Sequence, residues 1–166
     1  MSLYDIDTLI SQARKLAAEY KSATEKTLPG VSNEIAEHDA AKLLDLQLCN
    51  DRSAGFDAIG CNQREGIRYQ IKGRTIFDES KTNQRLGQIK SDKTWDAIVL
   101  VLLNSDYEAF ELYEATREEV LQVIDKPSSA QKKRGALSVA RFRAIGTLVW
   151  SLENNYESEL WSNRDD

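Results

Sequence analysis

Apolar residues recur at three- and four-residue spacing along the first part of the chain, which predicts an amphipathic helix. Its apolar positions are Ile6, Leu9, Ile10, Ala13, Leu16, Ala17 and Tyr20. The sequence Leu28-Pro29-Gly30 interrupts this pattern, and either Ser32 or Asn33 is suited to cap a second helix that runs to about Leu48. The apolar face of that second helix consists of Ile35, Ala40, Ala41, Leu43, Leu44 and Leu48.

The periodicity then changes to one that is typical of strands. A short apolar segment at 56–59 and an alternating segment at 67–72 flank a turn-rich connection, which predicts a β-hairpin. Residues 95–103 are almost continuously apolar, so we expect a strand buried on both faces in the middle of a sheet. A turn at 104–106 leads into a fourth strand, from Tyr107 to Ala115.

The last third of the chain is predicted to be helical. Thr116 followed by Glu119 is a capping-box pattern for a helix that ends near Ile124, and residues 139–161 are expected to be mostly helical. The whole order predicts a single α/β domain with a central mixed β-sheet of about four strands flanked by helices. Its parts are an N-terminal helix (1–30), a core of one helix and three or more strands (31–125), and a basic loop with C-terminal helices (126–166).

Several classes of protein are disfavoured by the same sequence. No apolar run approaches the roughly 20 residues of a transmembrane helix, and the first residues do not follow the pattern of a signal peptide. Cys49 and Cys61 form no CxxC pair, and His38 has no neighbour at zinc-ligand spacing. We therefore expect a cytoplasmic protein with no membrane partner, no disulfide scaffold and no structural zinc.

The net charge of −5 conceals a segregated pattern. Residues 64–93 contain eight basic and four acidic residues, and residues 126–150 contain six basic and no acidic ones. The segment 104–125 contains seven acidic residues and one basic residue. Such segregation can guide a polyanion to one face of an acidic protein, although it is also common on ordinary solvated surfaces.

Polar side chains interrupt or adjoin apolar segments at three places. Asp57 lies in the first strand of the predicted hairpin, Gln70 and Lys72 share one face of the second, and the preceding helix carries Glu34 and Glu37. Phosphodiester hydrolysis needs a hard divalent cation, which oxygen ligands hold, and a group that positions the attacking water. Taken singly, these residues have structural explanations, such as a cross-strand ion pair between Asp57 and Lys72.

Taken together, Asp57, the sequence Gln70-Ile71-Lys72 and the preceding helix with Glu37-His38-Asp39 resemble the PD-(D/E)xK nuclease superfamily. The Gln-x-Lys form is similar to the Mrr-type restriction endonuclease branch, and the helix is similar to that of archaeal Holliday-junction resolvases. The resemblance covers about residues 32–115 and implies a restriction-endonuclease-like core. It implies catalytic roles for Glu37, Asp57, Gln70 and Lys72, with Mg²⁺ or Mn²⁺ held by Asp57, Gln70 and Glu37. Two departures are that Phe56 stands before Asp57 where proline is usual, and that Gln70 replaces an acid; Glu34 also stays open as the helix acid.

The basic segments supply candidate contacts to DNA phosphates. These residues are Arg74, Lys81, Arg85, Lys90, Lys93, Lys132, Lys133, Arg134, Arg141 and Arg143. The predicted function is a metal-dependent DNA endonuclease of restriction, defence or repair type. A homodimer would supply two sites for cutting both strands, and a partner subunit or a methyltransferase would accompany a restriction role. The alternatives are a catalytically weak or inactive DNA-binding or scaffold module on the same fold, and a protein-interaction domain that uses the acidic segments.

Overall fold

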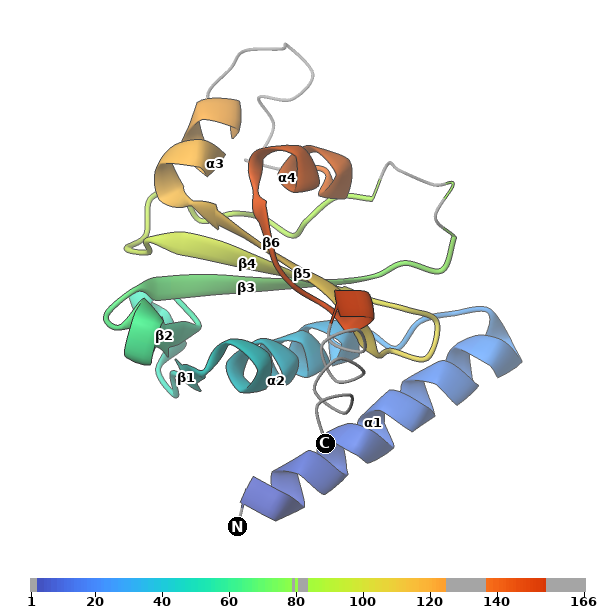
Figure 1. Ribbon diagram of the computed structural model, residues 1–166. Helices are drawn as coiled ribbons and strands as arrows, with labels where there is room; N and C mark the ends of the chain where they lie inside the picture. The colour runs from blue at the N-terminus through green and yellow to red at the C-terminus, as the bar shows by residue number, and fades with distance from the viewer. Residues whose placement is uncertain (1–2, 79, 81–83, 125–136, 155–166) are drawn as a thin grey trace, which may run out of the picture.

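The computed structural model describes residues 3–78, 80, 84–124 and 137–154, and it is an α/β fold built on one mixed six-stranded sheet (Figure 1). The strands are β1 (Leu46–Leu48), β2 (Ala58–Gly60), β3 (Arg68–Thr75), β4 (Ala97–Leu103), β5 (Ala109–Thr116) and β6 (Thr147–Ser151). The helices are α1 (Leu3–Thr24), α2 (Val31–Leu44), α3 (Arg117–Ile124) and α4 (Val139–Ile145), with short 3₁₀ turns at Arg52–Ala54 and Asn62–Arg64. The strands lie in chain order, and only β3 and β4 pair in parallel.

The sheet is wider than predicted, because two segments expected to be helical are strands. Helix α2 ends at Leu44, four residues early, since Asp45 adopts a left-handed conformation (φ 56°) and the chain turns into β1. Residues 147–151, expected within a C-terminal helix, form β6, where Leu148 and Trp150 pair with Tyr113 and Leu112 of β5. The segment Thr-Leu-Val-Trp-Ser is rich in β-branched and aromatic residues, which favour strands once a neighbouring edge is available.

The hydrophobic core lies on both faces of β4. Every residue of this strand is buried, which confirms the prediction of a central strand. On one face, Val99 and Val101 belong to a cluster with Ile35 and Ala40 of α2. On the other face, Ile98, Leu100 and Leu102 belong to a second cluster, in which their partners are Leu86, Ile89, Trp95, Ala115, Val120, Leu137, Val139 and Phe142. Figure 1 accordingly shows α2 on one side of the sheet and α3 and α4 on the other.

The connection between β3 and β4 also contributes to the second cluster. Because the two strands are parallel, the chain must cross over the sheet between them. Leu86, Ile89 and Trp95 of this crossover are buried on the face opposite α2. The crossover therefore runs over the face of β3 that carries Gln70 and Lys72.

Two local predictions are confirmed, and one is wrong. Strands β2 and β3 form the expected antiparallel pair, and the Thr116 hydroxyl and the Glu119 backbone N–H bond across the first turn of α3 (3.2 Å). The N-cap of α2 is Gly30 in a left-handed conformation (φ 81°), not Ser32 or Asn33. Both predicted caps instead contact β3, through Ser32 Oγ and Thr75 Oγ1 (3.2 Å) and through the bond that Gly73 N–H donates to Asn33 Oδ1 (3.4 Å).

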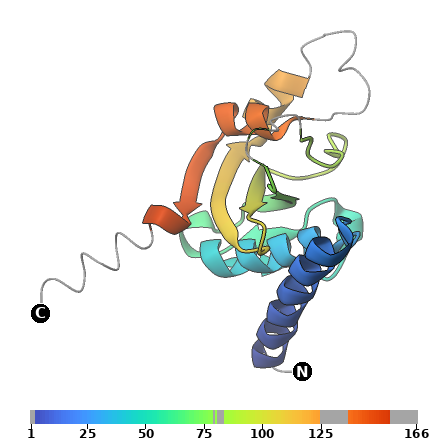
Figure 2. The same ribbon diagram turned by 90° about the vertical axis from the view of Figure 1, so that its right-hand side faces the viewer.

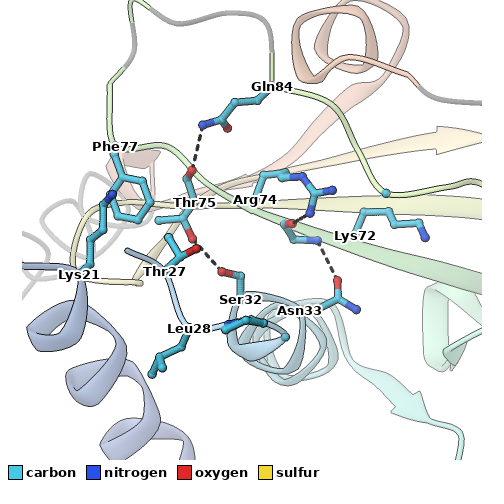
Figure 3. A pocket seen from close by; sticks show the side chains of 14 residues that line it. Lys21, Thr27, Leu28, Ser32, Asn33, Lys72, Arg74, Thr75, Phe77 and Gln84 are labelled. Carbon is cyan, nitrogen blue, oxygen red and sulfur yellow. Dashed lines mark hydrogen bonds between the residues drawn. The ribbon is translucent and has the colours of Figure 1, made fainter. Parts of the chain in front are cut away.

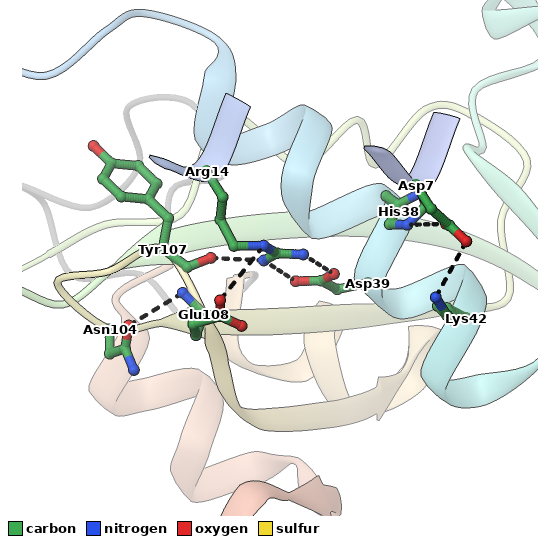
Figure 4. A network of polar contacts seen from close by, with 8 residues as sticks. All are labelled: Asp7, Arg14, His38, Asp39, Lys42, Asn104, Tyr107 and Glu108. Atoms are coloured by element: carbon green, nitrogen blue, oxygen red, sulfur yellow. Dashed lines mark hydrogen bonds and ion pairs between the residues drawn. The ribbon is translucent and has the colours of Figure 1, made fainter. Parts of the chain in front are cut away.

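Helix α1 packs obliquely against α2 and is held there by polar contacts (Figures 2 and 4). The Arg14 guanidinium donates two hydrogen bonds to the Asp39 carboxylate, at 2.7 and 2.8 Å, and a third to the carbonyl of Tyr107 (2.7 Å). Nearer the start of α1, Asp7 lies 3.0 Å from His38 Nε2. Among the described residues, no helix is both long enough and apolar enough to cross a membrane.

Candidate active site

Asp57 occupies the point where β2 and β3 separate. Ala58 and Ile59 are the β2 residues in register with β3, so among the described residues no strand lies beside this edge of β3 beyond Tyr69. The Asp57 backbone N–H donates to Tyr69 O (2.7 Å), and its carboxylate Oδ2 accepts the N–H of Ile71 (2.8 Å). A side chain thus satisfies a backbone group that β2 is too short to reach. The Asp57 carboxylate is held beside the residue that separates Gln70 from Lys72.

Gln70 is almost completely buried, with 3% of its surface exposed. Its Nε2 donates to the carbonyl of Gly55 (3.1 Å), which fixes the orientation of the amide. Its Oε1 has no hydrogen-bond partner among the described residues. A buried polar atom without a partner is costly, so this oxygen is suited to a donor or cation that is not part of the protein.

Lys72 lies two residues further along the same face of β3. Its Nζ donates to the carbonyl of Gln88 in the crossover (3.0 Å). Burial lowers the pKa of Lys72 below its ordinary 10.5, and the nearby positive charges of Arg74 and Lys90 lower it further. The negative charges of Asp57 and Glu37 act in the opposite direction. Lys72 is therefore within electrostatic reach of both predicted acids.

Glu37, rather than Glu34, is the helix acid that faces into the protein. Glu37 is 3% exposed, whereas Glu34 is on the solvent side of α2. Helix α2 comes this close to β3 because Gly73 has no side chain: a Cβ built there would lie 2.4 Å from the Cβ of Ala36. Glu37 is the next residue of this closely packed helix, and its negative charge acts on Lys72.

The donor set at this end of β3 fits a hard divalent cation. Asp57 and Glu37 offer carboxylates, and Gln70 offers a neutral amide oxygen that lacks a partner. Magnesium prefers oxygen ligands and is typically held by one or two carboxylates. Two acids and an amide therefore offer the types of ligand that a magnesium site needs. Within the described part of the chain, no three or more His, Cys, Asp or Glu residues form a group that could hold a metal ion. The amide of Gln70 would therefore have to take the place of a third acid.

The predicted phosphate-contacting residues lie in different surroundings. Arg85, Lys90 and Lys93 are exposed on the crossover, and Arg141 is exposed on α4. Arg74 is half-buried and donates to the carbonyls of Arg85 (2.6 Å) and Gly73 (2.7 Å). The predicted contacts Lys81, Lys132, Lys133 and Arg134 lie outside the described residues.

Arg143, another predicted phosphate contact, already lies beside an acid of the protein. Its Nη2 lies 3.4 Å from the Glu111 carboxylate, and its guanidinium lies 5.5 Å from the centre of the Tyr113 ring. Tyr113 and Lys72 share a face of the sheet, since both are in register with Leu100 of β4. To contact a phosphate, the Arg143 guanidinium would have to break its ion pair with Glu111 or bind the phosphate and Glu111 at the same time.

A pocket of about 600 Å³ adjoins Lys72, and the sequence did not predict it (Figure 3). Its walls are the end of α1, the α1–α2 linker, the first turn of α2, the second half of β3 and residues of the crossover. These segments belong to two stretches of the chain that are far apart in sequence, residues 21–33 and 72–87. Of its cations, Lys72 and Arg74 were predicted as site residues, whereas Lys21 was not.

Comparison with known proteins adds no family assignment. No protein-family model matches the chain, and no curated protein matches it significantly.

Proposed function

We propose that this protein is a metal-dependent nuclease that hydrolyses phosphodiester bonds of DNA. The proposal rests on the arrangement of four residues at one end of β3. Its main support is the buried Oε1 of Gln70, which has no hydrogen-bond partner among the described residues, close to a carboxylate that binds Ile71 N–H. An oxygen in this position needs a cation or a donor, and Asp57 and Glu37 are the two acids whose negative charges act on neighbouring Lys72.

In this proposal Asp57, Glu37 and Gln70 hold Mg²⁺ or Mn²⁺. The metal ion, when bound, lowers the pKa of a coordinated water and offsets negative charge on the phosphoryl group. Asp57 is kept in place by the Ile71 N–H, and Gln70 by the Gly55 carbonyl. Both ligands are therefore preorganised by main-chain groups of the hairpin.

Lys72 supplies the remaining chemistry. Its pKa is lowered by burial, so it gives up a proton more readily than an exposed lysine. It can orient the attacking water or stabilise the negative charge that develops on the phosphate. The exposed Arg85, Lys90 and Lys93 on the neighbouring crossover provide phosphate contacts that carry no sequence information.

The test is cleavage of supercoiled plasmid DNA in Mg²⁺ or Mn²⁺ by matched variants. Asp57→Asn and Glu37→Gln remove one charge each with little change in shape, and Glu34→Gln is the control because it removes the same charge from the exposed side of the same helix turn. We expect Lys72→Gln to lose on the order of 10²–10⁴-fold in rate. Cleavage that survives Asp57→Asn, Glu37→Gln and Lys72→Gln alike would contradict this site.

A second experiment tests the role of Gln70 without relying on turnover. Gln70→Glu adds a carboxylate, but it also loses the N–H that bonds Gly55 O and places a negative charge beside that carbonyl. We expect this variant to be less stable than wild type in EDTA and to gain more stability from Mn²⁺, because a metal that binds only the folded state stabilises it. An equal Mn²⁺ effect on both proteins would contradict Gln70 as a ligand. DNA binding without metal uptake or cleavage would instead favour a non-catalytic DNA-binding module.

A further inference from the structure

The pocket beside Lys72 is strongly polarised in charge. Lys21, Lys72 and Arg74 line it, and the described residues of its wall include no acidic side chain. This is unusual in a chain with 27 acidic and 22 basic residues. Figure 3 shows Lys72 and Arg74 on one side of the pocket, and Lys21 with Phe77 on the other. Such a concentration of one sign of charge in a concave site attracts anions.

The cations are held in place rather than free to turn away. Arg74 donates from Nε to Arg85 O and from Nη1 to Gly73 O, and neither bond uses Nη2. Lys21 donates to Glu25 O (2.8 Å) and lies 4.8 Å from the centre of the Phe77 ring. Lys72 is held by Gln88 O. A fixed guanidinium and two fixed ammonium groups lose little conformational entropy when they bind an anion.

Two further features indicate what kind of anion fits. The first turn of α2 lines the pocket from Gly30 to Asn33, and its backbone N–H groups add partial positive charge. On the opposite wall, Gln84 donates from Nε2 to Thr75 O (3.3 Å), while its buried Oε1 has no partner among the described residues. An acceptor of this kind needs an N–H or O–H group. A nucleotide offers such groups on its sugar and base.

The position of the pocket along β3 matches the spacing of phosphates on a nucleic acid strand. Lys72 belongs both to the candidate active site and to the pocket, and Arg74 follows two residues later on the same face, about 7 Å further along the strand. This separation is similar to that of neighbouring phosphates on an extended nucleic acid strand. A strand with one phosphate at the active site would direct the next phosphate toward Arg74.

We propose that this pocket binds the terminal phosphate of a nucleic acid strand whose neighbouring phosphodiester lies at the active site. A phosphomonoester carries about −1.5 to −2 charges near neutral pH, and it suits three cations better than the single charge of an internal phosphodiester. The inference rests on the proposed nuclease function for the source of the ligand. The pocket itself does not depend on the metal site, because neither Asp57 nor Glu37 lines it.

Gly87 provides a matched pair of variants. A Cβ built at Gly87 would lie 3.6 Å from Arg74 Nη2 and 4.0 Å from Lys72 Nζ, which are ordinary contacts, and its backbone is outside the left-handed region. Gly87→Ala should therefore leave the pocket usable. Gly87→Asp places a carboxylate against both cations, so it should neutralise and block the pocket.

The experiment is fluorescence anisotropy in EDTA, with one short single-stranded DNA prepared with a 5′-phosphate, a 3′-phosphate or hydroxyl groups at both ends. We expect a terminal phosphate at one end to tighten binding about tenfold in wild type, Gly87→Ala and Asp57→Asn, and this gain to disappear in Gly87→Asp. The two phosphorylated oligonucleotides identify which end is bound. Equal binding of all three DNAs by wild type, or an undiminished gain in Gly87→Asp, would overturn the proposal.

Inorganic phosphate separates a nucleotide site from a general anion site. Inorganic phosphate and a mononucleotide are compared as competitors of the phosphorylated DNA. If both displace the DNA equally well, the nucleoside contributes nothing to binding, and the assignment to a nucleic acid end is wrong. Cleavage in Mn²⁺ is measured separately on the same proteins, both with the supercoiled plasmid and with the end-phosphorylated DNA. Tighter binding of phosphorylated DNA without any cleavage would support the phosphate pocket and contradict the nuclease function. Cleavage without tighter binding would support the nuclease function and contradict the pocket.

Discussion

Gly73→Ala tests the close packing of α2 against β3, on which the position of Glu37 depends. A Cβ at residue 73 would lie 2.4 Å from the Cβ of Ala36 and 2.9 Å from the backbone oxygen of Ser32. Carbon atoms in contact prefer about 3.5–4.0 Å, so α2 would have to move away from β3 by about 1 Å. The second contact is with backbone, which cannot turn aside as a flexible side chain can.

The expected cost follows from these two contacts. Overpacking a well-packed core costs about 1–3 kcal/mol, and a clash with both a helix side chain and a helix carbonyl belongs at the upper end. Replacing glycine by alanine also restricts the unfolded chain, which offsets roughly 0.4–1 kcal/mol. We therefore expect Gly73→Ala to lower the free energy of unfolding by about 2 kcal/mol, measured by urea denaturation with the tryptophan fluorescence as the signal.

A double-mutant cycle assigns this loss to the contact with Ala36. Ala36→Gly removes the 2.4 Å contact but costs about 1 kcal/mol of helix propensity and leaves the contact with Ser32. The two changes should couple favourably by about 1 kcal/mol. Gly87→Ala is the control, because its Cβ meets only ordinary contacts. A Gly73→Ala protein as stable as Gly87→Ala, or a cycle with no coupling, would refute this explanation of the helix position.

Three other predictions concern the contacts that hold the fold. Arg14→Met leaves the Asp39 carboxylate without its ion-pair partner at a site where the two side chains are only 14% and 10% exposed, so urea denaturation should show a loss of about 3 kcal/mol. Hydrogen bonds from Arg68 hold the pKa of Asp96 below its ordinary 3.8; this pair therefore stabilises the fold above that pH and loses its effect as the pH falls through the lowered pKa. Carboxyl NMR should show Asp96 titrating below 3.8 in wild type and closer to it in Arg68→Gln. Thr116→Ala should cost about 1 kcal/mol in thermal or urea unfolding through loss of the α3 cap, whereas Thr116→Ser should not.

The sequence predicts the parts of this fold whose signals are local. The apolar run at 97–103 predicts a strand buried on both faces, because so short a run rich in β-branched residues is typical of a central strand. The pattern of Thr116 and Glu119 predicts a helix start, since the reciprocal bonds form within one turn. The proximity of Asp57 to Gln70 and Lys72 follows from the length of the hairpin connection.

The remaining features depend on contacts between distant segments. Residues 147–151 have an apolar pattern that is ambiguous between helix and strand, and the free edge of β5 decides in favour of a strand. The N-cap at Gly30 was missed because Ser32 and Asn33 are good cap residues, yet β3 binds their side chains instead. The pocket combines two distant stretches of the chain, residues 21–33 and 72–87, so no local pattern could have predicted it. The choice between Glu34 and Glu37 likewise required the rotation of α2 relative to the sheet.

Two local features of the fold shape the candidate site: a short strand and a glycine at a close contact between helix and strand. Strand β2 has only three residues, so it leaves Ile71 N–H without a strand partner, and the Asp57 carboxylate takes that place. Gly73 has no side chain, so α2 closes on β3, and the negative charge of buried Glu37 on this helix acts on Lys72. Had β2 continued by two residues, the ladder would have satisfied Ile71 and left Asp57 without its anchor. Main-chain carbonyls then hold the polar groups of the other two residues. Gln70 donates to Gly55 O in the loop before β2, and Lys72 donates to Gln88 O in the β3–β4 crossover. The geometry that orients the four residues is therefore set by backbone groups, so conservative changes such as Asp57→Asn and Glu37→Gln can test their chemistry while leaving the fold in place.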